Sequence, residues 1–318
     1  MDQQRWPNLE SIKAAHARIK DYIHHTPVLH SSAIDHLAGS QLCFKCENFQ
    51  KVGAFKARGA ANAVLKLSES ERKNGVATHS SGNHAAALAR AATQIGIPAY
   101  IVMPSNAPEI KKAAVRNYGG QIVECEPTLS SRESTLAEVV KKTGATFIHP
   151  FNNLDVIEGQ ATCALELITD QPDLEAVIAP VGGGGLLSGS ALTLHYLSPN
   201  TKVYAGEPQE ADDAFLSFQS GRLQTVDASN TIADGLRTAL GEITFGIIRK
   251  HVTAILTVTE TDILHAMQLV YERLKIVIEP SAAVPLAAIL THKDIFQGQK
   301  VGIILSGGNV DLTSLPFR

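Results

Sequence analysis

The sequence contains one run of four consecutive glycines: Gly182, Gly183, Gly184 and Gly185. Glycine loses more conformational freedom on folding than any other residue, so the run is costly unless a tight turn or a close ligand requires it. The apolar segment 174–181 before the run is typical of a buried strand, and segment 186–197 after it is typical of a helix. A glycine loop at a helix start offers free backbone N–H groups to an anion. The run therefore predicts a phosphate-bearing ligand.

A nicotinamide dinucleotide is the competing candidate ligand for this loop. Glu207 ends the next apolar segment, near the position of an acid that would bind the ribose. The spacing G-x-G-x-x-G is absent, because Leu187 stands where the last glycine would be, counted from Gly182. A plain tight turn would need only about one or two glycines. We therefore rank a small phosphate-bearing cofactor first, a nicotinamide cofactor second and a purely structural turn third.

Lys56 is the residue best suited to covalent chemistry. It lies between Phe55 and Ala57, where a helical segment at 56–67 begins. Lysines are usually exposed, so composition alone favours a surface position. An apolar pocket disfavours the charged ammonium, however, and would provide the neutral amine that reacts with a carbonyl group.

The elements that must position these residues alternate between helix-like and strand-like segments. This alternation predicts an α/β fold with mostly parallel sheets covered by helices on both faces. Polar turns follow apolar strands at the glycine run, at 78–84 and at 305–312. Such turns gather at the carboxyl ends of the strands in a doubly wound sheet, where ligands bind. We expect a small domain at 75–146, inserted into a large domain formed by 1–74 and 147–318.

Composition and charge exclude several kinds of partner. The 318 residues carry a formal net charge of -3 and no basic run, which argues against nucleic acid or an anionic membrane. The N-terminal segment has no apolar core of the secretory kind, so we expect a reduced, cytoplasmic protein. Segment 176–201 has no charged residue, but its glycines, proline and hydroxyl residues argue against a membrane helix.

Several common catalytic motifs are absent or incomplete. Cys43 and Cys46 have the spacing C-x-x-C, but no second pair follows and the segment is typical of a strand. Zinc binding or redox chemistry is therefore the less favoured interpretation. Neither G-x-S-x-G nor H-E-x-x-H occurs, so the sequence gives little support for a serine hydrolase or a zinc protease.

A series of short motifs covers almost the whole chain: HTPVL, KCENFQKVGAFKARGA, THSSGNH, AYIVMP, VECEP, PVGGGG, EPQEADD, TIADG, IEPSAA and LSGGNVDL. In their number and order these motifs resemble the fold-type II pyridoxal-phosphate enzymes of the serine racemase and serine/threonine dehydratase group. Within that group the sequence is most similar to the eukaryotic-type racemases. The resemblance implies a fold like that of the tryptophan synthase β chain, with a large cofactor-binding domain and a small substrate-gripping domain.

The resemblance implies how the cofactor would be held. Lys56 resembles the Schiff-base lysine that binds pyridoxal 5′-phosphate, and the four glycines resemble the cup for its phosphate. Asn83 resembles the partner of the ring hydroxyl, and Ser306 the partner of the pyridine nitrogen. A serine at that nitrogen, in place of an aspartate, keeps the electron sink moderate.

The resemblance also implies how a small amino acid would be bound. The residues that match the turn for the substrate carboxylate are Ser80, Ser81, Asn83 and His84. Arg132 is expected to reach in when the small domain closes. Ser81 also matches the family's second base, opposite Lys56. The expected substrate is serine, with threonine as a further candidate, and the expected reactions are racemisation and elimination to pyruvate and ammonia.

The segment GEPQEADDA resembles the family's divalent-cation site. Glu207 and Asp213 would supply carboxylates and Ala211 a backbone carbonyl, which are hard oxygen ligands suited to Mg or Ca. Two carboxylates near a strand end otherwise indicate an ordinary solvated loop, so this expectation rests on the resemblance. We also expect a homodimer.

The sequence departs from the family pattern at a few positions. Ala54 stands where serine is usual, and Ala85 and Ala86 replace the Gly-Gln that contacts a regulatory ATP in the animal enzymes, which argues against nucleotide activation. Phe151 occurs as in many threonine dehydratases and favours elimination over racemisation. The alternatives that stay open are a dehydratase of serine, threonine or 3-hydroxyaspartate with little racemase activity, a nicotinamide-dependent oxidoreductase, and a catalytically silent ligand-binding protein.

Overall fold

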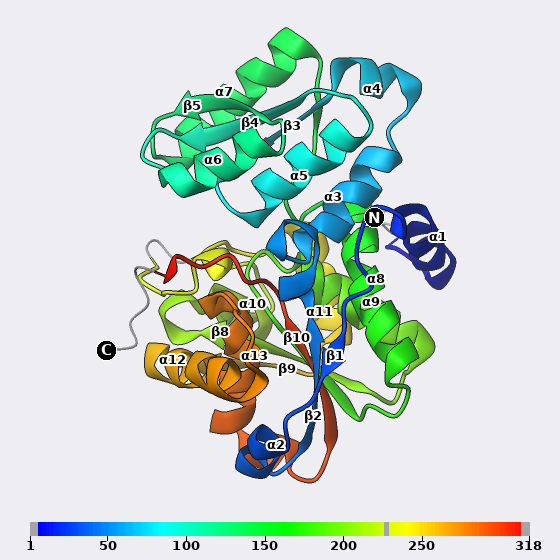
Figure 1. The fold of residues 1–318 in the computed structure, drawn as a ribbon, viewed down its shortest axis with the longest axis vertical. Coiled ribbons are helices and arrows are strands. Elements are labelled where there is room, and N and C mark those ends of the chain that lie inside the picture. Colours follow the sequence, from blue (N-terminus) through cyan, green and yellow to red (C-terminus); the bar gives the residue numbers. More distant parts are fainter. Residues whose placement is uncertain (1–5, 226–228, 313–318) are drawn as a thin grey trace.

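The fold is built on two separate sheets, seen in a computed structural model that describes residues 6–225 and 229–312 (Figure 1). The larger sheet has the strand order β1-β2-β10-β7-β8-β9, and every pair is parallel except β1 with β2. Its strands are β1 (Val28–Leu29), β2 (Gln41–Cys46), β7 (Ala176–Pro180), β8 (Lys202–Pro208), β9 (Ala254–Val258) and β10 (Lys300–Leu305). The α/β class with mostly parallel sheets is thus confirmed.

The smaller sheet has the order β5-β4-β3-β6, with all of its pairs parallel. Its strands are β3 (Val76–His79), β4 (Ala99–Pro104), β5 (Gln121–Cys125) and β6 (Thr146–Phe147). One face packs on α3 (Lys56–Leu65), α5 (Asn83–Gln94) and α6 (Glu109–Asn117), and the other face packs on α7 (Leu129–Thr143). Strands β3, β4 and β5 lie within the predicted 75–146 segment and β6 crosses its end; the division into a small and a large domain stays a proposal.

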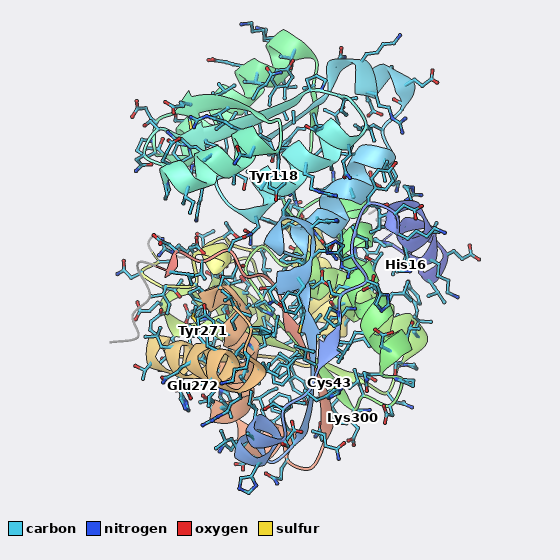
Figure 2. The ribbon with its side chains drawn as sticks, viewed as in Figure 1. His16, Cys43, Tyr118, Tyr271, Glu272 and Lys300 are labelled. Atoms are coloured by element: carbon cyan, nitrogen blue, oxygen red, sulfur yellow. The ribbon has the colours of Figure 1, made fainter. Side chains whose placement is uncertain are left out.

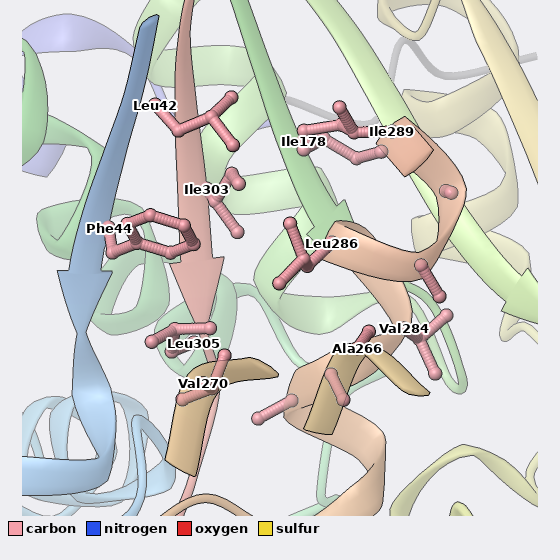
Figure 3. Close-up of a cluster of buried hydrophobic side chains, with 14 of the residues drawn as sticks. Leu42, Phe44, Ile178, Ala266, Val270, Val284, Leu286, Ile289, Ile303 and Leu305 are labelled. Carbon is pink, nitrogen blue, oxygen red and sulfur yellow. The ribbon is translucent and has the colours of Figure 1, made fainter. Parts of the chain in front are cut away.

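The larger sheet is covered on both faces by buried apolar side chains. On one face, side chains of β2, β7 and β10 pack against α12 (Glu260–Leu269) and α13 (Pro280–Thr291), as Figure 3 shows. The other face packs on α8 (Leu154–Asp170), α9 (Gly185–Leu197), α10 (Asp213–Ser220) and α11 (Glu242–His251). The remaining helices are α1 (Leu9–Ile19), α2 (Ser32–Ala38), α4 (Glu69–Asn74) and α14 (Lys293–Phe296).

The two cysteines of the C-x-x-C segment lie in different cores. Cys43, on β2 beside β10 (Figure 2), packs with the α8 and α9 side, whereas Cys46 packs with the α13 side. Side chains that leave opposite faces of a strand cannot share one metal ion or form one disulfide. No helix in the described ranges is long and apolar enough to cross a membrane.

Candidate active site

The turn before Lys56 is held by the loop that follows β10. Val52 and Gly53 both have left-handed backbone angles, with φ values of 55° and 70°. A left-handed β-branched residue is strained, so the surroundings must hold it. Asn309 Nδ2 donates to the Val52 carbonyl at 2.7 Å, and Phe55 N donates to the Ser306 carbonyl at 3.0 Å. These bonds fix the start of α3 against the larger sheet.

A buried ionic cluster anchors the same helix from its other side. Arg58 lies two residues after Lys56 and is fully buried. Its guanidinium donates to Glu47 and to Glu166, each at 2.7 Å, and also to Thr162 Oγ1 at 3.2 Å. Removing one partner from a buried charge pair costs about 3–5 kcal/mol, so this cluster strongly constrains where the first turn of α3 can lie.

The Lys56 ammonium lies inside the protein, although part of the side chain remains exposed. Its Nζ donates to the Pro150 carbonyl at 2.9 Å. Desolvation lowers the pKa of Lys56 to about 8, against the attraction of the Glu279 carboxylate, which raises it. A larger fraction of this amine is therefore neutral near neutral pH than for an exposed lysine, as nucleophilic attack on a carbonyl requires.

The glycine run forms the turn between β7 and α9, where the resemblance places the phosphate cup. A Cβ atom added to Gly183 would lie 2.2 Å from the Phe151 ring, and one added to Gly182 would lie 2.9 Å from the Leu236 backbone. Gly184 has a left-handed φ of 84°, which a side chain would strain. The first N–H groups of α9 have no partner within the helix, and the helix dipole makes this end positive. The cup therefore suits a phosphate group.

The second polar turn, between β3 and α5, carries Ser80, Ser81 and Gly82. Ser80 Oγ accepts a hydrogen bond from Gly82 N at 3.3 Å, which shapes the turn. The Ser81 side chain is half-buried, and its hydroxyl makes no hydrogen bond to any residue that the structure describes. Ser81 is thus available to a ligand.

Asn83 is the first residue of α5, and both the nitrogen and the oxygen of its side-chain amide are hydrogen-bonded. Its Nδ2 donates to the two carboxylate oxygens of Glu279 at 3.0 and 3.1 Å, and its Oδ1 accepts from Asn309 Nδ2 at 2.9 Å. Burial raises the pKa of Glu279 to about 7, although the bond from Asn83 lowers it. Glu279 was given no role from the sequence, although it lies in the IEPSAA motif, immediately before the proline that begins α13.

His84 is buried and uncharged. Its Nε2 lies 3.2 Å from the Ile148 carbonyl, so Nε2 carries the proton and donates. Burial, together with the charge of Lys56, lowers the pKa of His84 to about 3. The other ring nitrogen, Nδ1, is buried and has no partner among the described residues. A buried acceptor without a donor is the kind of atom that a bound polar ligand satisfies.

Of the two other expected site residues, Ser306 lies next to the Lys56 turn and Arg132 lies on α7. Ser306 is buried immediately after β10, and its carbonyl accepts from Phe55 N next to Lys56. Burial is the main cause that lowers the pKa of His79, and the charge of Arg132 adds to it. The structure records no hydrogen bond between Arg132 and the described residues of the Ser80–His84 turn, and its Nε has no partner there.

The three residues expected to bind a cation lie between β8 and α10. Glu207 and Asp213 are 1% and 4% exposed, and Ala211 is also buried. Desolvation raises the pKa of Glu207 to about 9 and that of Asp213 to about 6. Glu207 caps α10 by accepting from Ala214 N at 2.9 Å and Phe215 N at 2.7 Å, whereas Asp213 Oδ2 is buried without a partner in the described chain.

This donor set fits a divalent cation. Two desolvated carboxylates, one with an oxygen that lacks a partner, are relieved by a positive charge, and oxygen ligands suit Mg or Ca. Within the described ranges no group of three or more His, Cys, Asp or Glu side chains could hold a metal ion. A cation at Glu207 and Asp213 would therefore depend on backbone carbonyls and water for its other ligands.

An amine with a lowered pKa, a glycine cup and a polar turn on this two-sheet α/β frame define a fold-type II pyridoxal-phosphate enzyme. The chain belongs to the family described as pyridoxal-phosphate dependent enzymes, whose model matches residues 19–307. The residues present fit that cofactor, because the start of α9 offers unpaired backbone N–H groups to a phosphate and His84 Nδ1 is buried without a donor in the described chain.

Relatives of known activity are similar over nearly the full chain. A β-hydroxyaspartate dehydratase of Paracoccus denitrificans is 52% identical over 98% of this chain and 99% of its own length. A serine racemase of Dictyostelium discoideum is 50% identical over 99% of this chain and 98% of its own. The structure of maize serine racemase matches with a TM-score of 0.95 at 46% identity, and covers 98% of this chain and 96% of that one.

Proposed function

We propose that this enzyme racemises serine and also eliminates water from it, giving pyruvate and ammonia. The observation that carries the proposal is the Lys56 amine, desolvated and close enough to His84 for its charge to lower the pKa of the imidazole. His84 follows directly on the Ser80–Asn83 turn, and we propose that the amine and this turn line one ligand space. The similarity to serine racemases supports the same choice.

Each polar group of this space has a task in the proposal. Bound pyridoxal phosphate supplies the electron sink for negative charge that develops at the substrate α-carbon. Ser80, with the N–H groups at the start of α5, holds the substrate carboxylate. Lys56 takes the proton from the α-carbon on one face, and Ser81 exchanges it on the other. Asn83, braced by Glu279, and Ser306 hold the cofactor ring.

A dehydratase of 3-hydroxyaspartate with little racemase activity is the second candidate. The Phe151 ring lies against His149 and beside Gly183, so this wall of the site is apolar. 3-Hydroxyaspartate has a second carboxylate that needs a cation, and Arg132 Nε is a donor without a partner in the described chain. The similarity to the Paracoccus dehydratase favours the same candidate.

Product analysis of the cofactor-loaded enzyme tests the proposal. L-Serine and L-threo-3-hydroxyaspartate are supplied in parallel, and D-serine, pyruvate and oxaloacetate are measured as initial rates. We expect both D-serine and pyruvate from L-serine. Oxaloacetate at a much higher kcat/KM, with no detectable D-serine, would select the dehydratase. No product from either substrate would contradict both candidates.

We further propose that Glu207, Ala211 and Asp213 bind a divalent cation, and that the protein is a cytoplasmic homodimer. The cation proposal is supported by the two raised pKa values and the unpartnered Asp213 oxygen. The dimer proposal is supported by exposed apolar side chains such as Phe49 and Val277, which are 43% and 45% exposed.

The cation proposal predicts that Mg²⁺ stabilises the metal-free protein more at pH 8 than at pH 5.5. Without metal, the pKa values of both acids are raised above their unfolded values. Their contribution to the free energy of unfolding is therefore present at low pH and is lost as the pH rises through about 6 for Asp213 and about 9 for Glu207. Mg²⁺ replaces protons at the site and therefore binds better at pH 8. At ~100 times its Kd it should add about 2.7 kcal/mol to the free energy of unfolding.

Thermal melts after chelation, with and without Mg²⁺, measure this effect. Asp213→Asn should remove most of the gain, and Asp212→Asn, one residue earlier, serves as the matched control. If the melting temperature of the chelated wild type does not respond to Mg²⁺ at either pH, the cation proposal is wrong.

A further inference from the structure

Two helices extend from the glycine run to a pair of histidines at their C-terminal ends. α9 starts at Gly185, and Thr244 in the first turn of α11 donates to the Gly183 carbonyl at 2.9 Å. The two helices pack along each other (Figure 1), so their C-terminal ends also meet. His195 in the last turn of α9 and His251 at the end of α11 lie with ring centroids 4.5 Å apart and planes tilted by 52°.

The geometry points to a binding site for a divalent transition-metal ion, which we assign to His195 and His251. Imidazole nitrogens are good ligands for Cu²⁺, Ni²⁺ and Zn²⁺. A metal that binds two imidazoles at about 2.0–2.1 Å from each nitrogen brings their ring centroids to about 4.5–5 Å. The observed centroid spacing of 4.5 Å lies within this range. Its nitrogen ligands distinguish this site from the proposed cation site at Glu207, whose ligands are oxygen atoms.

The charges around the pair favour a metal on balance. Burial, His195 and Lys250 together lower the pKa of His251 to about 4, so this ring is neutral at pH 7, the form that binds metals. Both rings lie at helix C-termini, where the dipole attracts cations. Lys250 opposes a second positive charge, but its ammonium is turned over the Trp6 ring, 5.4 Å from the centroid. Two protein ligands leave the other coordination positions to water, so the site binds reversibly.

The only tryptophan of the chain reports directly on this site. Trp6 packs edge-on against His251, with ring centroids 5.8 Å apart. Cu²⁺ has an unpaired electron and quenches a nearby indole, whereas Zn²⁺ does not. Cu²⁺ is titrated into the cofactor-loaded, Mg²⁺-saturated protein at pH 7, and the Trp6 emission is followed. We expect saturable quenching that excess Zn²⁺ reverses.

Variants distinguish Cu²⁺ binding at His195 and His251 from Cu²⁺ binding elsewhere on the protein. Loss of a residue that only orients a metal ligand costs about 10–100-fold in metal affinity. Loss of a ligand itself, in His195→Asn or His251→Asn, should therefore weaken Cu²⁺ binding by at least about tenfold. His265→Asn, an exposed histidine on α12, is the matched control and should leave the titration unchanged. Quenching of equal affinity in both pair variants, or no saturable quenching of the wild type, would overturn the assignment.

A second measurement on the wild type avoids any dependence on the variants' folding. Diethyl pyrocarbonate modifies unprotonated histidines, and peptide mapping gives the rate for each. Zn²⁺ should slow modification of His195 and His251 at least several-fold and leave His265 unaffected. Equal rates for the pair with and without saturating Zn²⁺ would overturn the assignment independently of the fluorescence.

Discussion

Replacement of Lys56 by alanine is expected to abolish turnover, by at least ~10⁴-fold in kcat, with L-serine or any other substrate. The variant loses both the amine that would hold pyridoxal phosphate covalently and the base for the α-proton. The fold should survive, because Lys56 makes one hydrogen bond, to the Pro150 carbonyl, whereas α3 is anchored by Arg58. The control is Lys66→Ala at the C-terminus of α3, which removes the ion pairs of this partly exposed lysine with Asp155 and Glu158 and should keep most of the activity.

Two measurements check this assignment. Borohydride treatment of the loaded wild type should fix the cofactor to the peptide that contains Lys56, and a label on a different lysine would contradict it. In the cofactor-free protein, acylation of Lys56 should rise with a midpoint near pH 8, because desolvation lowers its pKa to about 8. A midpoint near the ordinary lysine value of about 10.4 would show that the amine is solvated.

Local patterns predicted the strands and turns that form the site. The apolar segment 174–181, the glycine run and the helix after it correspond to β7, the cup and α9. These features could be predicted because a glycine turn, a buried strand and a helix start each depend mainly on the residues within them. The strand expected around Cys43 and Cys46 ends at Cys46 in the structure, where a 3₁₀ turn brings Glu47 to Arg58.

Properties that arise from packing were not visible in the sequence. The raised pKa of Glu279 and its bonds to Asn83 exist only because α13 and α5 meet at the loop after β10. The His195–His251 pair joins residues from two helices with no motif between them. The role of Lys56 followed from the family resemblance, since composition alone favoured a surface position.

Replacement of Ser81 by alanine is expected to affect the two enantiomers of serine differently. Racemisation needs a proton donor or acceptor on each face of the substrate, because one base returns the proton to the side from which it came. With Lys56 on one face, Ser81 is the candidate for the other, and its hydroxyl has no competing bond within the described chain. A free serine is a weak base, so the cofactor phosphate or water must share the proton.

The variant should therefore lose D-serine formation and elimination from D-serine by about 10²–10⁴-fold, the usual contribution of a positioned acid or base. Elimination from L-serine through Lys56 should fall far less. The matched control is Ser80→Ala, because Ser80 shapes the same turn by accepting from Gly82 N at 3.3 Å, and its loss should weaken all reactions together through KM. Initial rates for D-serine and pyruvate from each enantiomer measure the difference. If Ser81→Ala lowers the rates for both enantiomers equally, as Ser80→Ala should, Ser81 binds the carboxylate and is not the second base.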